Sequence, residues 1–152
     1  MSAQDSVRLS LRLLTTARLI EREVDAMMRA RFGSTIARFD FLSALDRHGP
    51  LTLGEVSQYL LVSNGNVTQL RARLEAEGHI TTQADANDRR IQNVRLTRAG
   101  ESVFKRMAKA HAACVDSLLG DLTQSDKQAL TRLLDGARAS IRRTLTKGDA
   151  AA

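Results

Sequence analysis

The chain has 152 residues, enough for one compact domain or for a small domain with an appended module. Hydrophobic residues make up 43% of it but aromatic residues only 3%, which argues against stacking platforms for single-stranded nucleic acid. The formal net charge of +6 favours polyanionic partners, and the excess is spread along the chain without a polybasic tail.

Three further features indicate the compartment. The single cysteine, Cys114, cannot form an internal disulfide, which fits a reducing cytosol. The N-terminal segment MSAQDSVRLS lacks the basic and then apolar layout of a signal peptide. No apolar run approaches the roughly 18 residues that span a bilayer. We therefore expect a soluble cytoplasmic protein without a membrane partner.

Two helices are predicted at the start of the chain. From about residue 6 to 31, apolar side chains recur at steps of three and four, which predicts one amphipathic helix. Gly33 directly after it fits a left-handed stop. A second helix is expected over about 35–47, because the sequence HGP at 48–50 cannot continue it.

Two short helices with clear start signals follow. Thr52 and Glu55 have the spacing of a capping box, in which each residue accepts a backbone N–H of the other. Ser63 is the expected cap of the next helix, which ends near Gly78. The inward face of that helix comprises Val67, Leu70 and Leu74.

A hairpin and two long helices complete the chain. Residues 80–83 and 91–96 are the predicted strands, with side chains alternating between two faces, and 84–90 form a polar turn. Thr97 caps a long helix, and a last helix starts at Thr123. Helix, short turn, helix and hairpin make a winged helix-turn-helix layout. We expect a mainly α fold with a small β-hairpin wing.

The outward face of the helix after Ser63 suits insertion into the major groove of B-form DNA. Gly65 permits close backbone approach, Gln69 can pair with adenine, and Thr68 can reach a thymine methyl or a phosphate. The alternative is an ordinary solvated helix, although such helices more often carry glutamate and lysine pairs. The candidate DNA contacts here are Ser63, Asn64, Gly65, Asn66, Thr68, Gln69, Arg71 and Arg73.

The turn of the hairpin carries Asp88, Arg89 and Arg90 in succession. A hairpin tip beside a groove-reading helix reaches the neighbouring minor groove, whose negative potential attracts arginine. Asp88 can orient the guanidinium of Arg90 through a charge-assisted bond. The alternative is a local surface salt bridge, which gives one of the two arginines no role. We therefore predict that all three residues belong to the DNA interface.

These motifs together resemble the MarR (multiple antibiotic resistance regulator) family of bacterial repressors. The resemblance covers roughly 35–100, through TIARFD, LTLGEVSQYL, VSNGNVTQLRARLEAEGHI, DANDRR and VRLTRAG. It implies a homodimer whose first and last helices intertwine, with two winged lobes on a pseudo-palindromic operator in double-stranded DNA. It also assigns the family's wing arginine to Arg90 and its wing aspartate to Asp88. The usual proline before this segment is Ala86 here.

The amount of apolar surface also favours a dimer. Residues 1–33 are the expected N-terminal dimerisation helix, 34–97 the winged lobe, 98–146 the C-terminal dimerisation helices and 147–152 a disordered tail. A monomer with a membrane-facing stripe is the alternative, but no aromatic anchors accompany that stripe. Apolar residues beyond what one small lobe can cover include Leu11, Leu14, Leu19, Leu118, Leu119 and Ile141.

The resemblance further implies a small anionic or phenolic effector, bound between the dimer helices and the lobe, that releases the repressor. Arg12, Arg18 and Arg38 can pair with a carboxylate, and His111 lies on the apolar face of a long helix. The alternative for each of these four residues is a surface or structural role.

Other functional classes find less support. The three histidines have no metal-ligand spacing, and no nucleophile motif, phosphate loop or dinucleotide fingerprint occurs, so we expect no catalytic residues, cofactor or metal. Cys114 follows two alanines on a packed helix, which indicates an inert thiol, whereas a redox-sensing regulator needs an exposed thiolate. A helical protein-interaction adaptor is the remaining alternative, and it leaves the wing arginines without a purpose.

Overall fold

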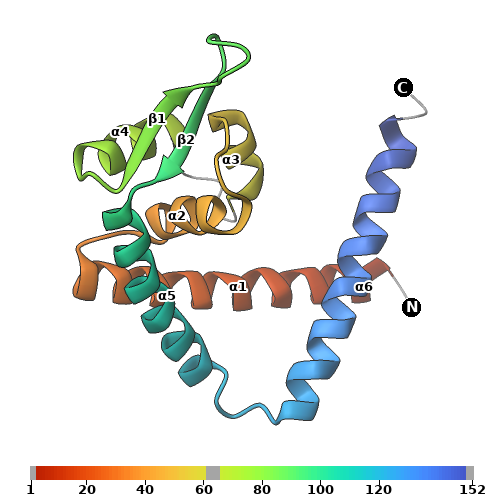
Figure 1. Ribbon diagram of the computed structural model, residues 1–152. Coiled ribbons are helices and arrows are strands. Elements are labelled where there is room, and N and C mark those ends of the chain that lie inside the picture. The colour runs from red at the N-terminus through yellow and green to blue at the C-terminus, as the bar shows by residue number, and fades with distance from the viewer. Residues whose placement is uncertain (1–2, 61–65, 150–152) are drawn as a thin grey trace. The chain divides into compact units, whose positions relative to one another are not determined.

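The computed structural model describes residues 3–60 and 66–149. Figure 1 shows a mainly helical chain with one β-hairpin, as the sequence predicted. The chain divides into two compact units, the first ending at Val115 and the second beginning at Asp116. In chain order the elements are α1 (Ala3–Phe32), α2 (Ile36–His48), α3 (Leu53–Tyr59), α4 (Val67–Ala76), β1 (Ile80–Ala84), β2 (Gln92–Leu96), α5 (Arg98–Leu118) and α6 (Gln124–Asp149).

The core of the first unit is built around α2, which contacts α1, α3, α4 and β2. The helix begins after Thr35, whose hydroxyl accepts the N–H of Arg38 at 3.2 Å, and ends at Gly49 with φ 77°. Its buried residues lie on more than one side of the helix and are Phe39, Asp40, Phe41, Leu42, Ala44 and Leu45. Side chains that complete this core come from α1 (Val24, Met28), α3 (Val56), α4 (Leu74), β2 (Val94) and α5 (Phe104, Met107).

Two of the predicted helix starts are confirmed as capping boxes. At α3, the N–H of Glu55 donates to the Thr52 hydroxyl at 3.2 Å, and the N–H of Thr52 donates to the Glu55 carboxylate at 2.8 Å. At α6, Thr123 and Asp126 exchange the same two bonds, both at 3.1 Å. The expected glutamate or aspartate at the third position therefore does fix the start of each helix.

The predicted start of α4 is wrong. The N-cap is Asn66, whose side-chain oxygen accepts the N–H of Gln69 at 3.2 Å. Asparagine caps a helix as well as serine does, and Asn66 directly precedes the apolar stripe that begins at Val67. Ser63 lies outside the described residues. The helix ends as predicted, since Gly78 has φ 74°.

The hairpin is tied to the start of α3. Its antiparallel strands pair Ile80 with Leu96 and Thr82 with Val94. Val94 also exchanges two backbone hydrogen bonds with Leu51, at 3.1 and 2.8 Å. Figure 1 shows the tip of the hairpin extending beyond the helices of the lobe. The wing thus projects from the lobe, while β2 is held by Leu51, two residues before α3.

The long helices leave many apolar side chains in contact with solvent. Leu11 and Leu14 on α1 are 58% and 55% exposed, and Ile141 on α6 is 61% exposed. Leu119, expected to add to this surface, is half-buried. None of the described helices combines the length and the apolar character needed to cross a membrane.

The predicted disordered tail begins too early. Helix α6 continues to Asp149, so residues 147–149 are helical. This stretch holds no proline, and a single glycine near a helix end costs only about 1 kcal/mol. Residues 150–152 lie outside the described part of the chain.

Candidate nucleic-acid interface

The outer face of α4 is polar and open to solvent. Asn66, Thr68 and Gln69 are exposed there, while Leu74 on the opposite face is 1% exposed. Asn66, Gln69 and Arg73 line one side of a surface hollow of about 460 Å³, and the start of α2 lines the other. The structure therefore brings the predicted contacts Asn66, Gln69 and Arg73 to one surface. The predicted contacts Ser63, Asn64 and Gly65 lie outside the described residues.

The two arginines of α4 have different surroundings. Arg71 is 31% exposed and lies 3.5 Å from the carboxylate of Glu75. Arg73 is 69% exposed, and its Nε donates to Glu77 at 3.0 Å. Arg73 is thus largely exposed although it pairs with Glu77, whereas Arg71 is partly enclosed in the lobe. The sequence interpretation overlooked both glutamates, although each lies four residues after an arginine, the spacing of a helical ion pair.

At the wing tip, Asp88 holds the guanidinium of Arg90 as the sequence predicted. Nε and Nη2 of Arg90 donate to the two carboxylate oxygens, each at 3.1 Å, and the Arg90 N–H adds a third bond at 3.0 Å. These bonds from Arg90 lower the pKa of Asp88 below its ordinary value. The Arg90 side chain is nevertheless 92% exposed. It is therefore oriented in advance and still available to a partner, as is the exposed Arg89 beside it.

Asp85 organises the turn that carries these residues. Its carboxylate accepts the N–H groups of Asn87 at 2.8 Å and Asp88 at 3.2 Å, and the side-chain amide of Asn93 at 3.1 Å. The two backbone bonds are the main cause of its lowered pKa. Ala86 therefore lies in a turn that is held by the Asp85 hydrogen bonds. The interpretation of the sequence missed Asp85. An aspartate whose side chain accepts the backbone N–H two residues later is a common turn motif.

The four effector candidates do not converge on one cavity. Arg12 and Arg18 are exposed on α1. Arg38 is mostly buried, pairs with Glu77 and donates to the Gly33 carbonyl at 3.2 Å. His111 stacks on a core phenylalanine at 4.8 Å between ring centroids, and burial lowers its pKa. Neither cavity that Arg38 lines includes any of the other three.

Cys114 is half-buried and packs against the core of the first unit. A thiol in such surroundings is a poor target for oxidants, which react with exposed thiolates. We expect that Cys114→Ser leaves both operator affinity and its response to peroxide unchanged. Fluorescence titration before and after peroxide treatment measures both. A peroxide response present in the native chain and lost in the variant would contradict this expectation and favour redox sensing.

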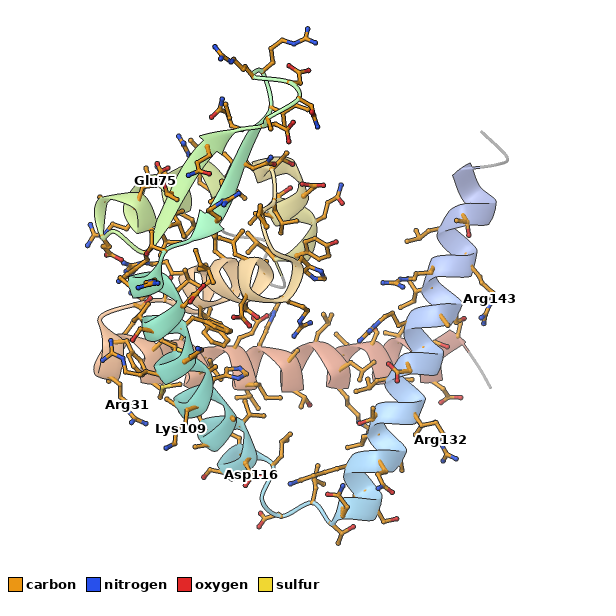
Figure 2. All side chains as sticks on the ribbon, in the orientation of Figure 1. Arg31, Glu75, Lys109, Asp116, Arg132 and Arg143 are labelled. Carbon is orange, nitrogen blue, oxygen red and sulfur yellow. The ribbon has the colours of Figure 1, made fainter. Side chains whose placement is uncertain are left out.

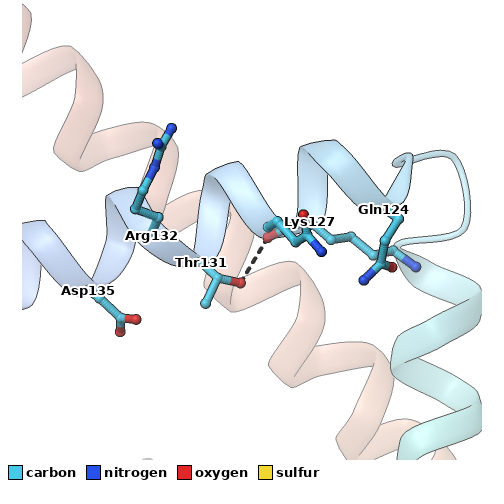
Figure 3. Close-up of a pocket in the computed structure, with 6 residues that line it drawn as sticks. Gln124, Lys127, Thr131, Arg132 and Asp135 are labelled. Carbon is cyan, nitrogen blue, oxygen red and sulfur yellow. Dashed lines mark hydrogen bonds between the residues drawn. The ribbon is translucent and has the colours of Figure 1, made fainter.

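Two other hollows carry charge. One follows a single face of α6, where Lys127, Arg132 and Asp135 mix both signs and Thr131 bonds its hydroxyl to the Lys127 carbonyl at 2.8 Å (Figure 3). The other lies between α1 and α5, from which Arg31 and Lys109 project (Figure 2). Both hollows are open to solvent. Within residues 3–60 and 66–149, no group of three or more histidine, cysteine or acidic side chains is placed to hold a metal ion.

Comparison with known sequences identifies relatives of this chain. A sequence model of the MarR family matches residues 32–91. Transcriptional activatory protein BadR of Rhodopseudomonas palustris is 31% identical over 123 residues, which cover 78% of this chain and 70% of the relative. The HTH-type transcriptional regulator PecS of Dickeya dadantii is 26% identical over 119 residues, covering 76% and 71% of the two chains.

Solved structures share the fold over nearly the whole chain. A MarR family transcriptional regulator from Silicibacter pomeroyi superposes with a TM-score of 0.79 and 28% identity, covering 93% of this chain and 99% of the other. BpsR of Bordetella bronchiseptica, described with a mechanism for regulation of its DNA binding by 6-hydroxynicotinic acid, gives a TM-score of 0.70 and 26% identity, covering 84% and 91%. From its motifs, fold and relatives, this chain belongs to the MarR family of transcription regulators.

Proposed function

We propose that this chain is a homodimeric repressor that binds a pseudo-palindromic operator and is released by a small anionic or aromatic effector. The observation that carries the proposal is the exposed Arg90 guanidinium, held by Asp88 at the tip of a hairpin that is anchored to the lobe of α4. A guanidinium held in place loses less conformational entropy when it enters a minor groove, so the contact is stronger.

In the proposed complex the exposed face of α4 lies in the major groove and the wing tip lies in the adjacent minor groove. Lysine and arginine contacts to phosphates provide most of the affinity, and a net charge of +6 supports such contacts. Thr68 and Gln69 on α4, Asn64 before it and the wing arginines select the sequence. Substitution of a residue that contacts phosphates should therefore weaken binding to all DNA. Substitution of a residue that contacts bases should weaken binding to the operator alone.

Exposed leucine and isoleucine side chains support the homodimer. On α1 they include Leu11 and Leu14, and on α6 Leu133 and Leu145, both 63% exposed. Soluble proteins rarely leave large contiguous apolar patches in water, and a second copy of the chain can cover such surfaces. A two-fold axis then places two half-sites about 34–36 Å apart, one turn of DNA.

Release by an effector and the direction of regulation call for a test in cells. The DNA binding of BpsR is regulated by an aromatic acid, which supports an effector of that class here. BadR is named an activatory protein, so repression needs direct measurement. A reporter fused to the region upstream of this gene should rise when the gene is deleted. A fall in that reporter would replace repression by activation.

The first binding test uses the purified protein, a labelled fragment of its own upstream region and random competitor DNA. We expect tight binding that resists the competitor and falls steeply with salt, with a logarithmic slope of about −0.9 for each phosphate neutralised. Equal and weak binding to all DNA would remove operator recognition from the proposal. Absence of binding even at low salt would favour the protein-interaction adaptor.

Asp88 allows a test in which orientation and charge predict opposite results. Asp88→Asn removes a negative charge from a surface that faces DNA, so electrostatics alone would strengthen binding. Loss of the charge-assisted bonds to Arg90 should instead weaken operator binding by about threefold or more. Fluorescence titration of both proteins at one salt concentration decides between the two. Stronger binding by the variant would show that Asp88 does not orient Arg90.

A further inference from the structure

Glu77 at the end of α4 contacts side chains from three parts of the lobe. One oxygen of its carboxylate, Oε1, accepts bonds from Nη2 of Arg38 on α2 and, at 3.0 Å, from Nε of Arg73 on α4. The other oxygen lies 3.4 Å from Nδ1 of His79, just before β1. Glu77 is also the C-cap residue of α4, and its N–H donates to the Arg73 carbonyl at 3.1 Å. It therefore connects Arg73 to α2, on which α4 packs (Figure 1).

Arg38 gives the Glu77 carboxylate a fixed anchor. The Arg38 side chain is only 11% exposed, and its Nη1 donates to the Gly33 carbonyl at 3.2 Å. Burial would raise the pKa of Glu77, but the bonds from Arg38 and Arg73 lower it below its ordinary value, so the carboxylate is ionised at neutral pH. An exposed glutamate and arginine four residues apart on a helix ordinarily form a weak pair. Here the glutamate is already held from inside the lobe.

The guanidinium of Arg73 is held at one end only. Its Nε is bonded to Glu77, whereas Nη1 and Nη2 have no bonded partner among the described residues. The side chain is 69% exposed, and it lines the hollow along α4 together with Asn66 and Gln69. The bond to Glu77 therefore fixes the guanidinium, while its two terminal amino groups remain available on the face of α4 that we propose binds DNA.

We propose that Glu77 is a positioning residue for operator binding, because it holds the Arg73 guanidinium ready to donate its terminal amino groups to a DNA phosphate. Glu77 itself does not touch DNA. Arg38 keeps the Glu77 carboxylate in place, and Arg73 makes the contact. An arginine side chain that is ordered before binding loses less conformational freedom in the complex, so the contact is stronger. This inference rests on the proposed function, to which it adds a residue that acts through another.

Glu77→Gln distinguishes the position of Arg73 from the amount of charge near DNA. Glutamine has nearly the same size, but its neutral oxygen is a weaker acceptor than a carboxylate. Removal of a negative charge would, by electrostatics alone, strengthen binding to any DNA. Loss of the bond to Arg73 should instead weaken operator binding by about threefold or more. In an Arg73→Ala background only the charge effect is left, so there Glu77→Gln should strengthen binding or leave it unchanged.

Fluorescence titration of four proteins with labelled operator measures this reversal: the native chain, each single variant and the double variant, all at one salt concentration. Circular dichroism checks that each is folded. Asp135→Asn is the matched control, because it removes the same charge from α6, where Asp135 lies 4.0 Å from Arg138. We expect nearly native affinity for this control. Stronger binding by Glu77→Gln alone, or an equal change in both backgrounds, would show that Glu77 does not act through Arg73.

A measurement without DNA tests the geometry. In ¹⁵N-labelled full-length protein, the Nε–H signal of Arg73 is the one lost in Arg73→Lys. We expect this hydrogen to exchange with water about tenfold more slowly than that of Arg142, an exposed arginine whose guanidinium has no bonded partner among the described residues. Glu77→Gln should remove this protection. Arg38→Gln should reduce it too, although Arg38 is not bonded to Arg73, because the carboxylate then loses its anchor.

These results distinguish failure of this inference from failure of the proposed function. Equal exchange at Arg73 and Arg142 in the native chain would overturn the held geometry. Full protection that persists in Arg38→Gln would overturn the anchoring of Glu77 by Arg38. If the native chain binds no operator, the proposed function fails, whereas the exchange measurement still decides whether Glu77 holds Arg73.

Discussion

Replacement of Gly100 by alanine is expected to lower the free energy of unfolding by about 3 kcal/mol or more, because the added carbon has no room. A Cβ at this position would lie 1.9 Å from the carbonyl oxygen of His79 and 2.8 Å from its carbonyl carbon. That oxygen also accepts the N–H of Thr97 at 3.0 Å, so it cannot retreat without breaking the bond. The clash involves backbone atoms, and a side-chain rotation cannot relieve it.

Urea denaturation followed by circular dichroism measures this loss. Gly136→Ala is the matched control, because Gly136 also lies within a helix, and apart from its chain neighbours and the backbone of its own helix no described atom lies within 4 Å of the added carbon. Alanine favours a helix over glycine, so this control should raise stability by about 0.5–1 kcal/mol. Equal changes in the two variants would mean that helix propensity, and not contact with His79, determines the residue at position 100. The expected opposite signs would explain the glycine that closes the sequence LTRAG.

Replacement of Arg90 by alanine should weaken operator binding by about 1–3 kcal/mol, while the protein remains folded. The side chain is 92% exposed, and its only described side-chain partner is Asp88, so folding loses little when it is removed. The operator complex loses a minor-groove contact, and Asp88 is then left as an unpaired negative charge beside the phosphates. The salt dependence should also decrease, with the logarithmic slope reduced by about 1.

A control variant distinguishes the effect of a positive charge at the wing tip from the effect of the protein's net charge. Arg22→Ala removes the same charge from α1, where the side chain is 71% exposed and pairs with its neighbour Glu23. Fluorescence titration should show nearly unchanged operator affinity for this variant. If Arg22→Ala and Arg90→Ala weaken binding equally, the wing contributes only net charge. If Arg90→Ala has native affinity, the wing does not enter the operator complex.

Much of the fold could be predicted because its signals are local. The capping box of Thr52 and Glu55 and the bond from Arg90 to Asp88 each join residues two or three apart, and both are present. Where several residues compete for one local role, the sequence was less decisive. Asn66 caps α4 although Ser63 carried the expected signal, because both side chains can accept the same kind of bond.

Contacts between distant residues could not be predicted from these patterns. The pair of Arg38 and Glu77 joins residues 39 apart, and only the folded arrangement of α2 and α4 brings them together. The interpretation left Arg38 as an effector candidate or a structural residue, and the structure gives it an acidic partner, Glu77, whose side chain is 28% exposed. The backbone pairing of Leu51 with Val94 likewise depends on the lobe being folded.

Under the proposed function, the pairing of Leu51 with Val94 has a consequence for the operator. The base of the wing is joined to the segment before α3 by the two Leu51–Val94 hydrogen bonds, and Thr82 of β1 donates its hydroxyl to Glu75 of α4. The wing and α4 are thus joined by hydrogen bonds within one lobe. If α4 reads bases in the major groove and the wing enters the minor groove, as we propose, the interval between these two positions within a half-site is constant. An operator can gain or lose base pairs between its half-sites if the two lobes can move apart, but one base pair inserted inside a half-site disrupts recognition.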